Sequence, residues 1–405
     1  MKRIIYSQID GTGSGFYGLF AFLGAVVLGA AFSVYNMEHA GHWITGMSNQ
    51  VIWGTPHVFA IFLIVAASGA LNVASIGSVF GKKIYKPLGR LSGLVALALL
   101  LGGLAVLVLD LGRPDRLIVA MTKYNFTSIF AWNIILYVGF MVIVAAYLWV
   151  QMERRMNIYA KYAGLVAFIW RLILTTGTGS ILGFIVAREA FDSAVLAPLF
   201  ITMSFSFGLA VFSLILITAA RGDGRALGDA VLERMGKLLG VFVAGVLYLT
   251  AVQHLTNLYM AKRVGIESFI LLDGGIYTQL FWGGQVILGG LLPLAIVYST
   301  VIKNAAVRLA AASVLVIAGG FAQIYVLLIG GQVYPQTLFP GMEVSSSFFD
   351  GVVAEYAPSG WEVSLGLGGV ALALLIVMVG IKFLSFLPQS MADEDMDPHH
   401  KASGA

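Results

Sequence analysis

Residues 94–116 read LVALALLLGGLAVLVLDLGRPDR, an uncharged apolar run that ends in a short charged turn. The run makes up most of a predicted membrane-spanning helix, which needs about 20 mainly apolar residues. The turn at 110–116 holds a glycine and a proline, which are typical of a helix end, and two Asp and two Arg residues that can neutralise one another. Charges near membrane depth are costly unless they are paired. The turn is therefore a closed helix end, part of a ligand or proton site, or both.

The composition excludes a soluble globular protein. Apolar residues make up 59% of the 405 residues and charged residues 11%, whereas soluble domains average about 45–50% and about 25%. The formal net charge of +4 is spread over the loops without a basic tract, so we expect membrane lipid and no nucleic acid around the chain. There is no cysteine, which excludes a cysteine-bound iron–sulfur cluster or zinc site of its own, and we predict no metal site.

The apolar segments predict ten transmembrane helices, and hence an all-α, polytopic membrane bundle. Only helices satisfy this much backbone within a bilayer when the apolar runs are continuous, since barrel strands would alternate in polarity. We expect the bundle to occupy residues 1–388 and residues 389–405 to form a disordered cytoplasmic tail. The expected spans are 15–35, 54–76, 89–110, 127–150, 160–187, 196–220, 237–261, 276–300, 305–329 and 361–386.

The distribution of Lys and Arg predicts the orientation of the bundle. Most of the 24 basic residues fall at the ends of the spans that share a side with the N-terminus. Because positive loops stay in the cytoplasm and the number of spans is even, both termini are expected to be cytoplasmic. The opposite side, called outward below, is expected to carry only Arg113, Arg116, Lys123, Arg188, Lys262 and Arg263.

The outward side is acidic and rich in aromatic residues. Its two long loops, about 36–53 and 330–360, are longer than usual for a compact helical bundle. They could form a docking surface for a peripheral partner, or their aromatic side chains could anchor helix ends at the membrane interface. The polar residues expected on this side are Glu38, His39, His42, Asp115, Glu189, Asp192, Asp273, Glu343, Asp350 and Glu355. The loop aromatics are Trp43, Trp53, Tyr334, Phe339, Phe348, Phe349 and Tyr356.

Arg171 is the one basic residue expected near the middle of a span, and no acidic residue is expected at a similar depth. An unpaired guanidinium there would cost about 2.5–3.5 kcal/mol or more. Arg171 should therefore face a hydrated cavity, backbone carbonyls or a bound anion-like group. It either serves a proton path or a cofactor, or it bridges helix carbonyls.

The histidines outside the tail gather toward the outward side. His57 opens the second span, and His254 lies in the outer third of the seventh. A quinone carbonyl needs a hydrogen-bond donor that also exchanges protons, and His does both near neutral pH. A b-type haem would need two imidazoles on facing helices, and only one deep candidate is present, so we do not expect haem b. A satisfied packing histidine is the remaining possibility for His57.

Several stretches resemble the family of NrfD and polysulfide-reductase membrane subunits, over about residues 50–220. The most specific is Asp-Leu-Gly-Arg-Pro at 110–114. The weaker matches are Trp53-Gly-Thr-Pro-His57, Ser128-Ile-Phe-Ala-Trp132, Thr176-Gly-Thr-Gly179 and Ala197-Pro-Leu-Phe200. Within the family, the ten spans most resemble the membrane subunits of sulfite-reduction-associated complexes.

The resemblance implies a subunit without metal centres that exchanges electrons between membrane quinone (menaquinone or ubiquinone) and a periplasmic, ferredoxin-like iron–sulfur partner. It further implies a multihaem cytochrome c, a membrane cytochrome b and a cytoplasmic iron–sulfur subunit as neighbours, in the inner membrane of a bacterium. The quinone would lie near the outward face within a four-helix bundle, close to His57. Where the family has Tyr-Thr-Gly beside the quinone, residues 177–179 are Gly-Thr-Gly, so Thr178 or Arg171 would have to replace the missing hydroxyl.

Combining residues and resemblance, we expect His57, Asp110, Arg113 and Thr178 at a quinone site, and Arg171, Glu189, Asp192 and His254 along a proton pathway. Three other functions stay open. A transporter or proton channel would need acidic residues within the spans, which the sequence does not show. A b-type cytochrome would show a haem spectrum, and a structural anchor would tolerate substitution of His57 or Arg171.

Overall fold

The computed structural model of the chain describes residues 4–336, 339, 342 and 351–396. Within these residues, ten helices are long and apolar enough to cross a membrane. Eight of them are α1 (Ser14–Ala40), α2 (Thr55–Ser78), α3 (Gly89–Leu109), α5 (Ile129–Met152), α6 (Ala160–Gly183), α7 (Leu196–Gly222), α8 (Asp229–Tyr259) and α14 (Gly360–Phe383). The other two are composite helices, in which α10, η7 and α11 form Ile276–Val297, and α12, η8 and α13 form Ala305–Val333.

The ten predicted spans are confirmed, and most of their ends agree within a few residues. The largest difference is at α8, which begins at Asp229 and not at 237. Its first two turns carry charged residues, so the helix continues beyond the apolar stretch that hydropathy detects. The short elements are β1 (Tyr6–Ser7), η1 (His42–Ile44), η2 (Lys83–Leu88), η3 (Pro114–Arg116), α4 (Leu117–Thr122), η4 (Asn157–Tyr159), η5 (Ala261–Arg263), α9 (Val264–Ser268), η6 (Phe269–Asp273), β2 (Leu387–Pro388) and α15 (Asp393–Met396).

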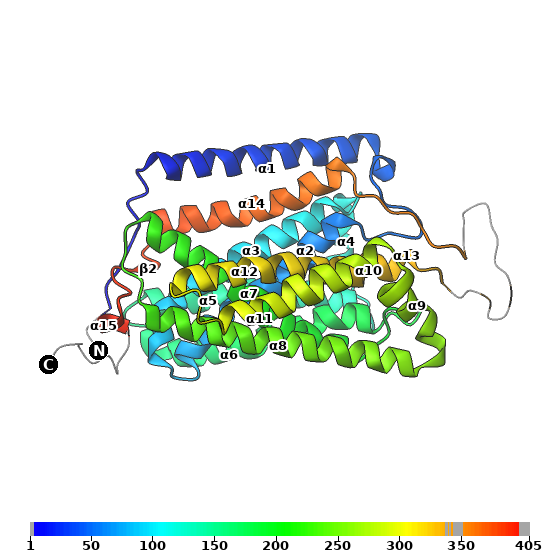
Figure 1. Cartoon of the computed structure of the whole chain (residues 1–405). Helices are drawn as coiled ribbons and strands as arrows, with labels where there is room; N and C mark the ends of the chain where they lie inside the picture. Colours follow the sequence, from blue (N-terminus) through cyan, green and yellow to red (C-terminus); the bar gives the residue numbers. More distant parts are fainter. Residues whose placement is uncertain (1–3, 337–338, 340–341, 343–350, 397–405) are drawn as a thin grey trace.

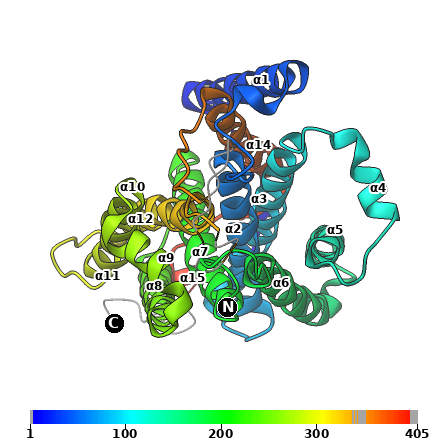
Figure 2. The same cartoon turned by 90° about the vertical axis from the view of Figure 1, so that its right-hand side faces the viewer.

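The long helices form two bundles and a peripheral pair (Figures 1 and 2). The first bundle consists of α2, α3, α5 and α6, and the second of α7, α8 and the two composite helices. The peripheral pair is α1 and α14, of which α14 packs against α2 and α3. α2 is the central helix, with 83% of its apolar window buried, whereas only 17% of the window of α1 is buried.

The two bundles meet where α2 crosses α7. Gly69 of α2 packs directly on Ser204 and Gly208 of α7, and a Cβ atom on Gly208 would overlap the backbone of Gly69 and Ala70. Small residues let membrane helices approach this closely, which increases their van der Waals contact. The glycines therefore join the bundles into one body, and side chains from both can contribute to a shared region.

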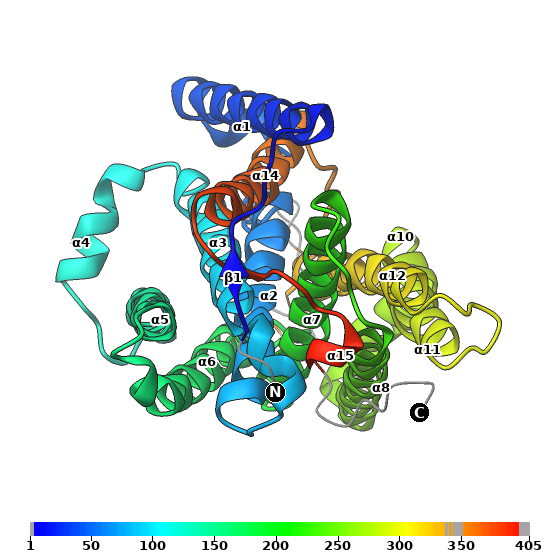
Figure 3. The same cartoon turned by 90° about the vertical axis from the view of Figure 1, so that its left-hand side faces the viewer.

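The first and last described elements, β1 and α15, lie at the same end of the bundle, as expected for an even number of spans (Figures 1 and 3). There β1 pairs with β2 in antiparallel register, and Arg225 donates hydrogen bonds to the carbonyls of Leu387 and Pro388. We refer to the opposite end as the outward end, following the predicted orientation.

The expectation of a disordered tail from residue 389 is wrong for its first part. The Gln389 amide donates to the Ile5 carbonyl, and Met391 is fully buried beside Leu227. Acidic composition alone did not indicate these backbone contacts to the N-terminal segment and the loop before α8. Residues 397–405, and the outward residues Glu343, Phe348, Phe349 and Asp350 named above, lie outside the described residues.

Candidate functional site

The charged turn after α3 is a helix end, as its sequence predicted. Asp110 follows the last helical residue, and its amide still donates to the Val106 carbonyl. Gly112 has a φ of +65°, a left-handed conformation that favours glycine, and Pro114 opens η3. This backbone path leaves the Asp110 side chain inside the protein, while the rest of the turn faces outward.

Asp110 is paired with His57 across the first bundle. His57 Nδ1 lies 2.9 Å from Asp110 Oδ2, and the Asp110 side chain is fully buried, whereas that of His57 is 16% exposed. The two groups are within ion-pair distance, but their alignment is not that of a hydrogen bond. Neither Asp110 oxygen has a hydrogen-bond donor among the described residues. Since a buried, unsatisfied carboxylate is costly, this site favours a further donor such as water or a ligand hydroxyl.

Trp53 forms the centre of an aromatic group at the outward end. Its ring centroid lies 6.4 Å from that of His57, 6.2 Å from Phe130 at the start of α5, and 6.5 Å from Phe191 in the loop before α7. The group therefore joins the first residues of α2 and α5 to the second bundle. Aromatic rings beside an imidazole provide an apolar wall with one polar, proton-exchanging group.

Gln332 and Arg188 hold the backbone that leads into α2. Gln332 Oε1 accepts from the amides of Ile52 and Trp53, and its Nε2 donates to the Trp53 carbonyl. Arg188 donates to the carbonyls of Gln332 and Gln50, each at 2.6 Å. Burial lowers the pKa of Arg188, since a charged guanidinium loses hydration there. These contacts fix the position of Trp53, whose ring lies beside His57.

A second buried carboxylate holds the same segment before α2 in place. Glu362, which is fully buried at the start of α14, accepts from the Gly46 and Ser359 amides and from the Tyr356 hydroxyl. Tyr356 in turn accepts from the amide of Thr55, the first residue of α2. Burial, and then the negative charge of Glu362, raise the pKa of Tyr356, so its hydroxyl stays protonated and can donate. With all these donors in place, Glu362 is a structural residue.

Arg113 is not brought to the His57–Asp110 pair. Its guanidinium makes two hydrogen bonds, of 3.0 and 3.1 Å, to Asp115 in the exposed part of the turn. The hydrogen bond from Arg113 lowers the pKa of Asp115. The expected neutralisation is therefore correct for Arg113 and Asp115, and wrong for Asp110, whose partner is His57.

Thr178 lies on α6 within the first bundle and is buried. Its hydroxyl donates to the Leu174 carbonyl and lies 3.5 Å from the hydroxyl of Tyr137 on α5. One turn outward from Tyr137, Asn133 donates to the Gly177 carbonyl, while its Oδ1 has no donor among the described residues. Tyr137 thus supplies a phenol from a neighbouring helix, next to the 177–179 stretch that lacks one.

Arg171 is fully buried between α2 and α7. It donates to Asn72 Oδ1 at 3.0 Å and to the Ser68 carbonyl at 3.4 Å, and the rings of Phe168 and Phe205 lie 4.9 and 4.8 Å from its guanidinium carbon. Its Nε has no acceptor among the described residues. This geometry corresponds to the bridging alternative, an Arg held by a backbone carbonyl, an amide oxygen and two aromatic faces.

The other three residues of the expected proton pathway lie at the outward end of the second bundle. His254 Nδ1 is 2.6 Å from Glu267 Oε2, and Arg263 contacts the carboxylate of Asp192 at 3.1 Å. Glu189 lies in the same loop as Asp192, and its charge adds to burial in raising the pKa of Tyr334. The structure brings His254, Asp192 and their partners together, and it places Arg171 in a separate contact network around α2.

Sequence reasoning missed several polar residues of this region. Glu267 was overlooked because it follows α8 in a short helix, and Gln332 because a neutral residue at a span end carries no charge signal. A buried Gln or Asn flanked by apolar residues, such as Asn133, was the available signal. Among the described residues, no group of three or more His, Asp and Glu side chains could hold a metal ion.

Comparison with known proteins finds relatives along almost the whole chain. The chain is 29% identical to the Hdr-like menaquinol oxidoreductase integral membrane subunit of Archaeoglobus fulgidus, over 96% of this chain and 98% of the relative. It is 27% identical to a putative dimethyl sulfoxide reductase membrane subunit of Halobacterium salinarum, over 95% and 94% of the two chains. It is 23% identical to a selenate reductase subunit of Mesobacillus selenatarsenatis, over 89% and 92%.

The sequence profile described as polysulphide reductase, NrfD, matches residues 43–336, which include both bundles and most of the site residues described above. The match continues beyond the stretch over which the motifs resembled that family. With its ten helices, the chain is a multi-pass membrane protein. It belongs to the polysulphide reductase NrfD family.

Proposed function

We propose that this chain is the quinone-interacting subunit of a membrane oxidoreductase complex. The observation that carries the proposal is the buried pair of Asp110 and His57, whose carboxylate oxygens have no hydrogen-bond donor among the described residues and whose imidazole lies beside Trp53. A quinol offers two hydroxyl donors and an apolar ring. The relative from Archaeoglobus fulgidus carries menaquinol oxidoreductase in its name, which supports menaquinol as the substrate class and its oxidation as the direction.

In the proposed reaction, a quinol gives up two protons and two electrons at the outward ends of α2, α3, α5 and α6. With Nδ1 directed at Asp110, Nε2 of His57 is the nitrogen that meets the quinol hydroxyl and takes its proton. Asp110 stabilises the resulting imidazolium by its negative charge. Asn133, Tyr137 and Thr178 line the polar interior of the same bundle, where they could bind the second oxygen of the ring.

The electrons must leave for another subunit, because the chain has no cysteine for a cluster. We propose an iron–sulfur protein docked at the outward end, where Glu38, His39 and Asp115 are exposed. Arg113 contributes to this surface, and Glu189, Asp192 and His254 handle protons at the same end. The resemblance noted above was to the membrane subunits of sulfite-reduction-associated complexes, of which DsrP in the DsrMKJOP complex is the example. It further supports a multihaem cytochrome c, a cytochrome b and a cytoplasmic iron–sulfur subunit as neighbours, in a bacterial inner membrane.

The test is a titration of the isolated full chain with a quinol analogue, read from tryptophan fluorescence, since Trp53 lies beside His57. Loss of a hydrogen bond to a charged group costs about 1.5–3 kcal/mol. We therefore expect His57→Ala to weaken binding about tenfold to hundredfold. The matched control is His39→Ala, which removes an exposed histidine stacked on Tyr35 and should leave binding unchanged. Equal affinity in both variants would refute the proposed site.

A further inference from the structure

The second bundle contains a His–carboxylate pair of its own. His254 Nδ1 and Glu267 Oε2 are 2.6 Å apart, and Asn257 donates to the other oxygen of Glu267 at 2.7 Å. Glu267 is only 1% exposed, and the ring of Phe281 packs edge-on against that of His254 with centroids 4.7 Å apart. A charge this deeply buried is costly without partners, and here the imidazole and the Asn257 amide are its partners.

A cavity of about 40 Å³ adjoins this pair. By volume it holds about two or three water molecules. Its polar lining comes from three helices of the second bundle and from α9, and it includes Nε2 of Gln253, a buried donor without an acceptor among the described residues. Polar cavities of this size hold ordered water that satisfies such groups. The lining residues with polar side chains are Thr250, Gln253, His254, Asn257, Glu267, Gln285 and Gln323.

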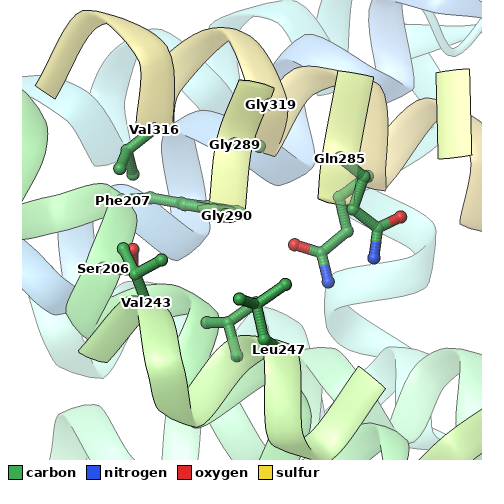
Figure 4. A pocket seen from close by; sticks show the side chains of 12 residues that line it. Ser206, Phe207, Val243, Leu247, Gln285, Gly289, Gly290, Val316 and Gly319 are labelled. Carbon is green, nitrogen blue, oxygen red and sulfur yellow. The ribbon is translucent and has the colours of Figure 1, made fainter. Parts of the chain in front are cut away.

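The polar lining continues toward the middle of the bundle. Gln285 and Gln323 also line a second cavity of about 10 Å³, which has room for about one water molecule. In Figure 4, Gln285 stands on the opposite side of this cavity from Phe207 and Val316. Val243 lines it too, near the midpoint of α8. Gln285 belongs to the π-helical segment η7, and such segments are frequent at functional sites.

Both glutamines donate to one hydroxyl between the cavities. Gln323 Nε2 is 3.2 Å and Gln285 Nε2 is 3.4 Å from Thr250 Oγ1, so Thr250 accepts twice and keeps its own proton to donate. Hydroxyl and amide side chains that alternate with water form a continuous hydrogen-bond network. In this bundle such a network, completed by water in the two cavities, would run from the middle of α8 to the His254–Glu267 pair.

The pair is also connected to the first bundle. Arg263 donates to Asn257 Oδ1, whose amide nitrogen binds Glu267, and Arg263 also contacts Asp192. Asp192 has a φ of +48° and directly follows Phe191, whose ring packs against Trp53. A change of charge at Glu267 would therefore act, through Asn257 and Arg263, on the loop that contacts the proposed quinone site.

We propose that the His254–Glu267 pair is a proton-holding site, which exchanges its proton with water in the two cavities of the second bundle. This deepens the proton-handling part of the proposed function, but it does not depend on where a quinone binds. With one proton the pair is neutral, as carboxylate and imidazolium or as carboxyl and imidazole. Transfer between these forms breaks an O–H bond of Glu267 and makes an N–H bond at His254 Nδ1, or the reverse.

A second proton, taken from cavity water, makes the pair cationic and leaves hydroxide to be neutralised from the bulk solvent. The groups that set this equilibrium lie on the elements packed around the pair. Arg263 carries a positive charge and donates to Asn257, the partner of Glu267, and Asp192 carries the opposite charge beside Arg263. The charged and titratable residues on these elements include Lys262, Arg263, Glu189, Asp192, Tyr248, Tyr259, Asp273, Tyr277, Tyr325 and Tyr334.

Infrared difference spectroscopy of the full chain, titrated with acid and base, tests the proposal directly. We expect a protonated-carboxyl C=O band that changes with pH, shifts in D₂O and is absent from Glu267→Gln, which keeps the side-chain shape. The matched control Asp273→Asn removes an exposed carboxylate on η6 and should keep the band. A band that survives in Glu267→Gln, or spectra in which Glu267 stays ionised at every pH, would overturn the proposal.

A second variant separates the water network from the pair itself, and covers the case in which Glu267→Gln does not fold. Gln323→Leu removes an amide that lines both cavities, so we expect the carboxyl band to exchange in D₂O several-fold more slowly than in the wild type. Gln279→Leu, an exposed position before η7, is the control. Unchanged exchange in Gln323→Leu would refute the network. Quinol-analogue affinity, measured on the same samples, reports the proposed quinone site independently of these results.

Discussion

Gln332 and Trp53 are joined by two reciprocal hydrogen bonds, each of 3.0 Å: the Trp53 amide donates to Gln332 Oε1, and Gln332 Nε2 donates to the Trp53 carbonyl. They are 279 residues apart in the chain. One side chain near the end of the ninth membrane helix thus replaces the backbone partners that a loop before a helix lacks. The segment before α2, which places Trp53 beside His57, is therefore held by a residue of the other bundle, Gln332.

Gln332→Ala should destabilise the segment before α2 that carries Trp53. The substitution leaves the part-buried Ile52 and Trp53 amides without acceptors, and an unsatisfied group costs about 1–3 kcal/mol when it is fully buried. We expect a lower midpoint of thermal unfolding in detergent and weaker binding of a quinol analogue. Gln279→Ala, at an exposed position, should match the wild type in both. Unchanged unfolding of Gln332→Ala would show that water replaces the amide without loss.

Asp110→Asn tests the role of the buried charge beside His57. The amide has nearly the same shape but cannot stabilise an imidazolium. We expect the variant to fold, to bind a quinol analogue more weakly than the wild type, and to lose less affinity than His57→Ala. Asp115→Asn, which changes the exposed partner of Arg113, should have no effect. An Asp110→Asn variant that binds as tightly as the wild type would remove Asp110 from the site. The titration used for His57 provides the measurement.

Two substitutions of Arg171 separate the effect of its charge from the effect of its side-chain volume on stability. Replacing a buried charge by an apolar side chain of similar size is often neutral or stabilising, whereas truncation to Ala leaves a cavity. We expect Arg171→Met to keep the unfolding temperature within a few degrees, and Arg171→Ala to lose about 2–5 kcal/mol of stability, as other large-to-Ala changes do. If Arg171 serves proton transfer, quinol oxidation by the assembled complex should fall in Arg171→Met despite normal folding. Normal turnover in Arg171→Met would leave Arg171 a purely structural role.

Gly208→Val should separate the bundles. Its side chain would overlap the backbone of Gly69 and Ala70, and neither backbone can move without disturbing the central helix α2. We expect a strong loss of folded protein in size-exclusion chromatography after extraction. Gly24→Val in α1, where a Cβ atom meets no neighbour, is the matched control. A well-folded Gly208→Val protein would contradict the close crossing of α2 and α7.

The positions of the helices could be predicted from the sequence, because hydropathy responds to the local chain and each span is continuous. The turn at 110–116 was likewise predictable, since Gly112 and Pro114 act on the backbone next to them. The partner of Asp110 was not. His57 precedes it by a whole helical hairpin, and nearby Arg residues were the more obvious counter-charges.

The second bundle shows the same limit more clearly. His254 was noticed because it is a rare titratable residue within a span, and Asp192 because it is acidic and outward. Glu267 became significant only once η5 and α9 fold back over the end of α8. Neutral residues such as Gln285 and Gln323 gain their role because they face one another. Whether they do so depends on how each helix is rotated about its own axis. In a helix that is apolar on all sides, the 3.6-residue period of the sequence does not define this rotation.

The pairing of β1 with β2 has a practical consequence for handling this protein. An affinity tag on either terminus would extend from the end of the molecule that carries β2 and α15, away from α4, which follows the Asp110 turn (Figure 1), so we expect neither tag to shield the aromatic group around Trp53. Trimming the chain past Gln8 would instead remove the strand that covers Leu387, and leave Arg225 without its acceptor at Gln8. Expression clones should therefore be lengthened and never shortened at the N-terminus.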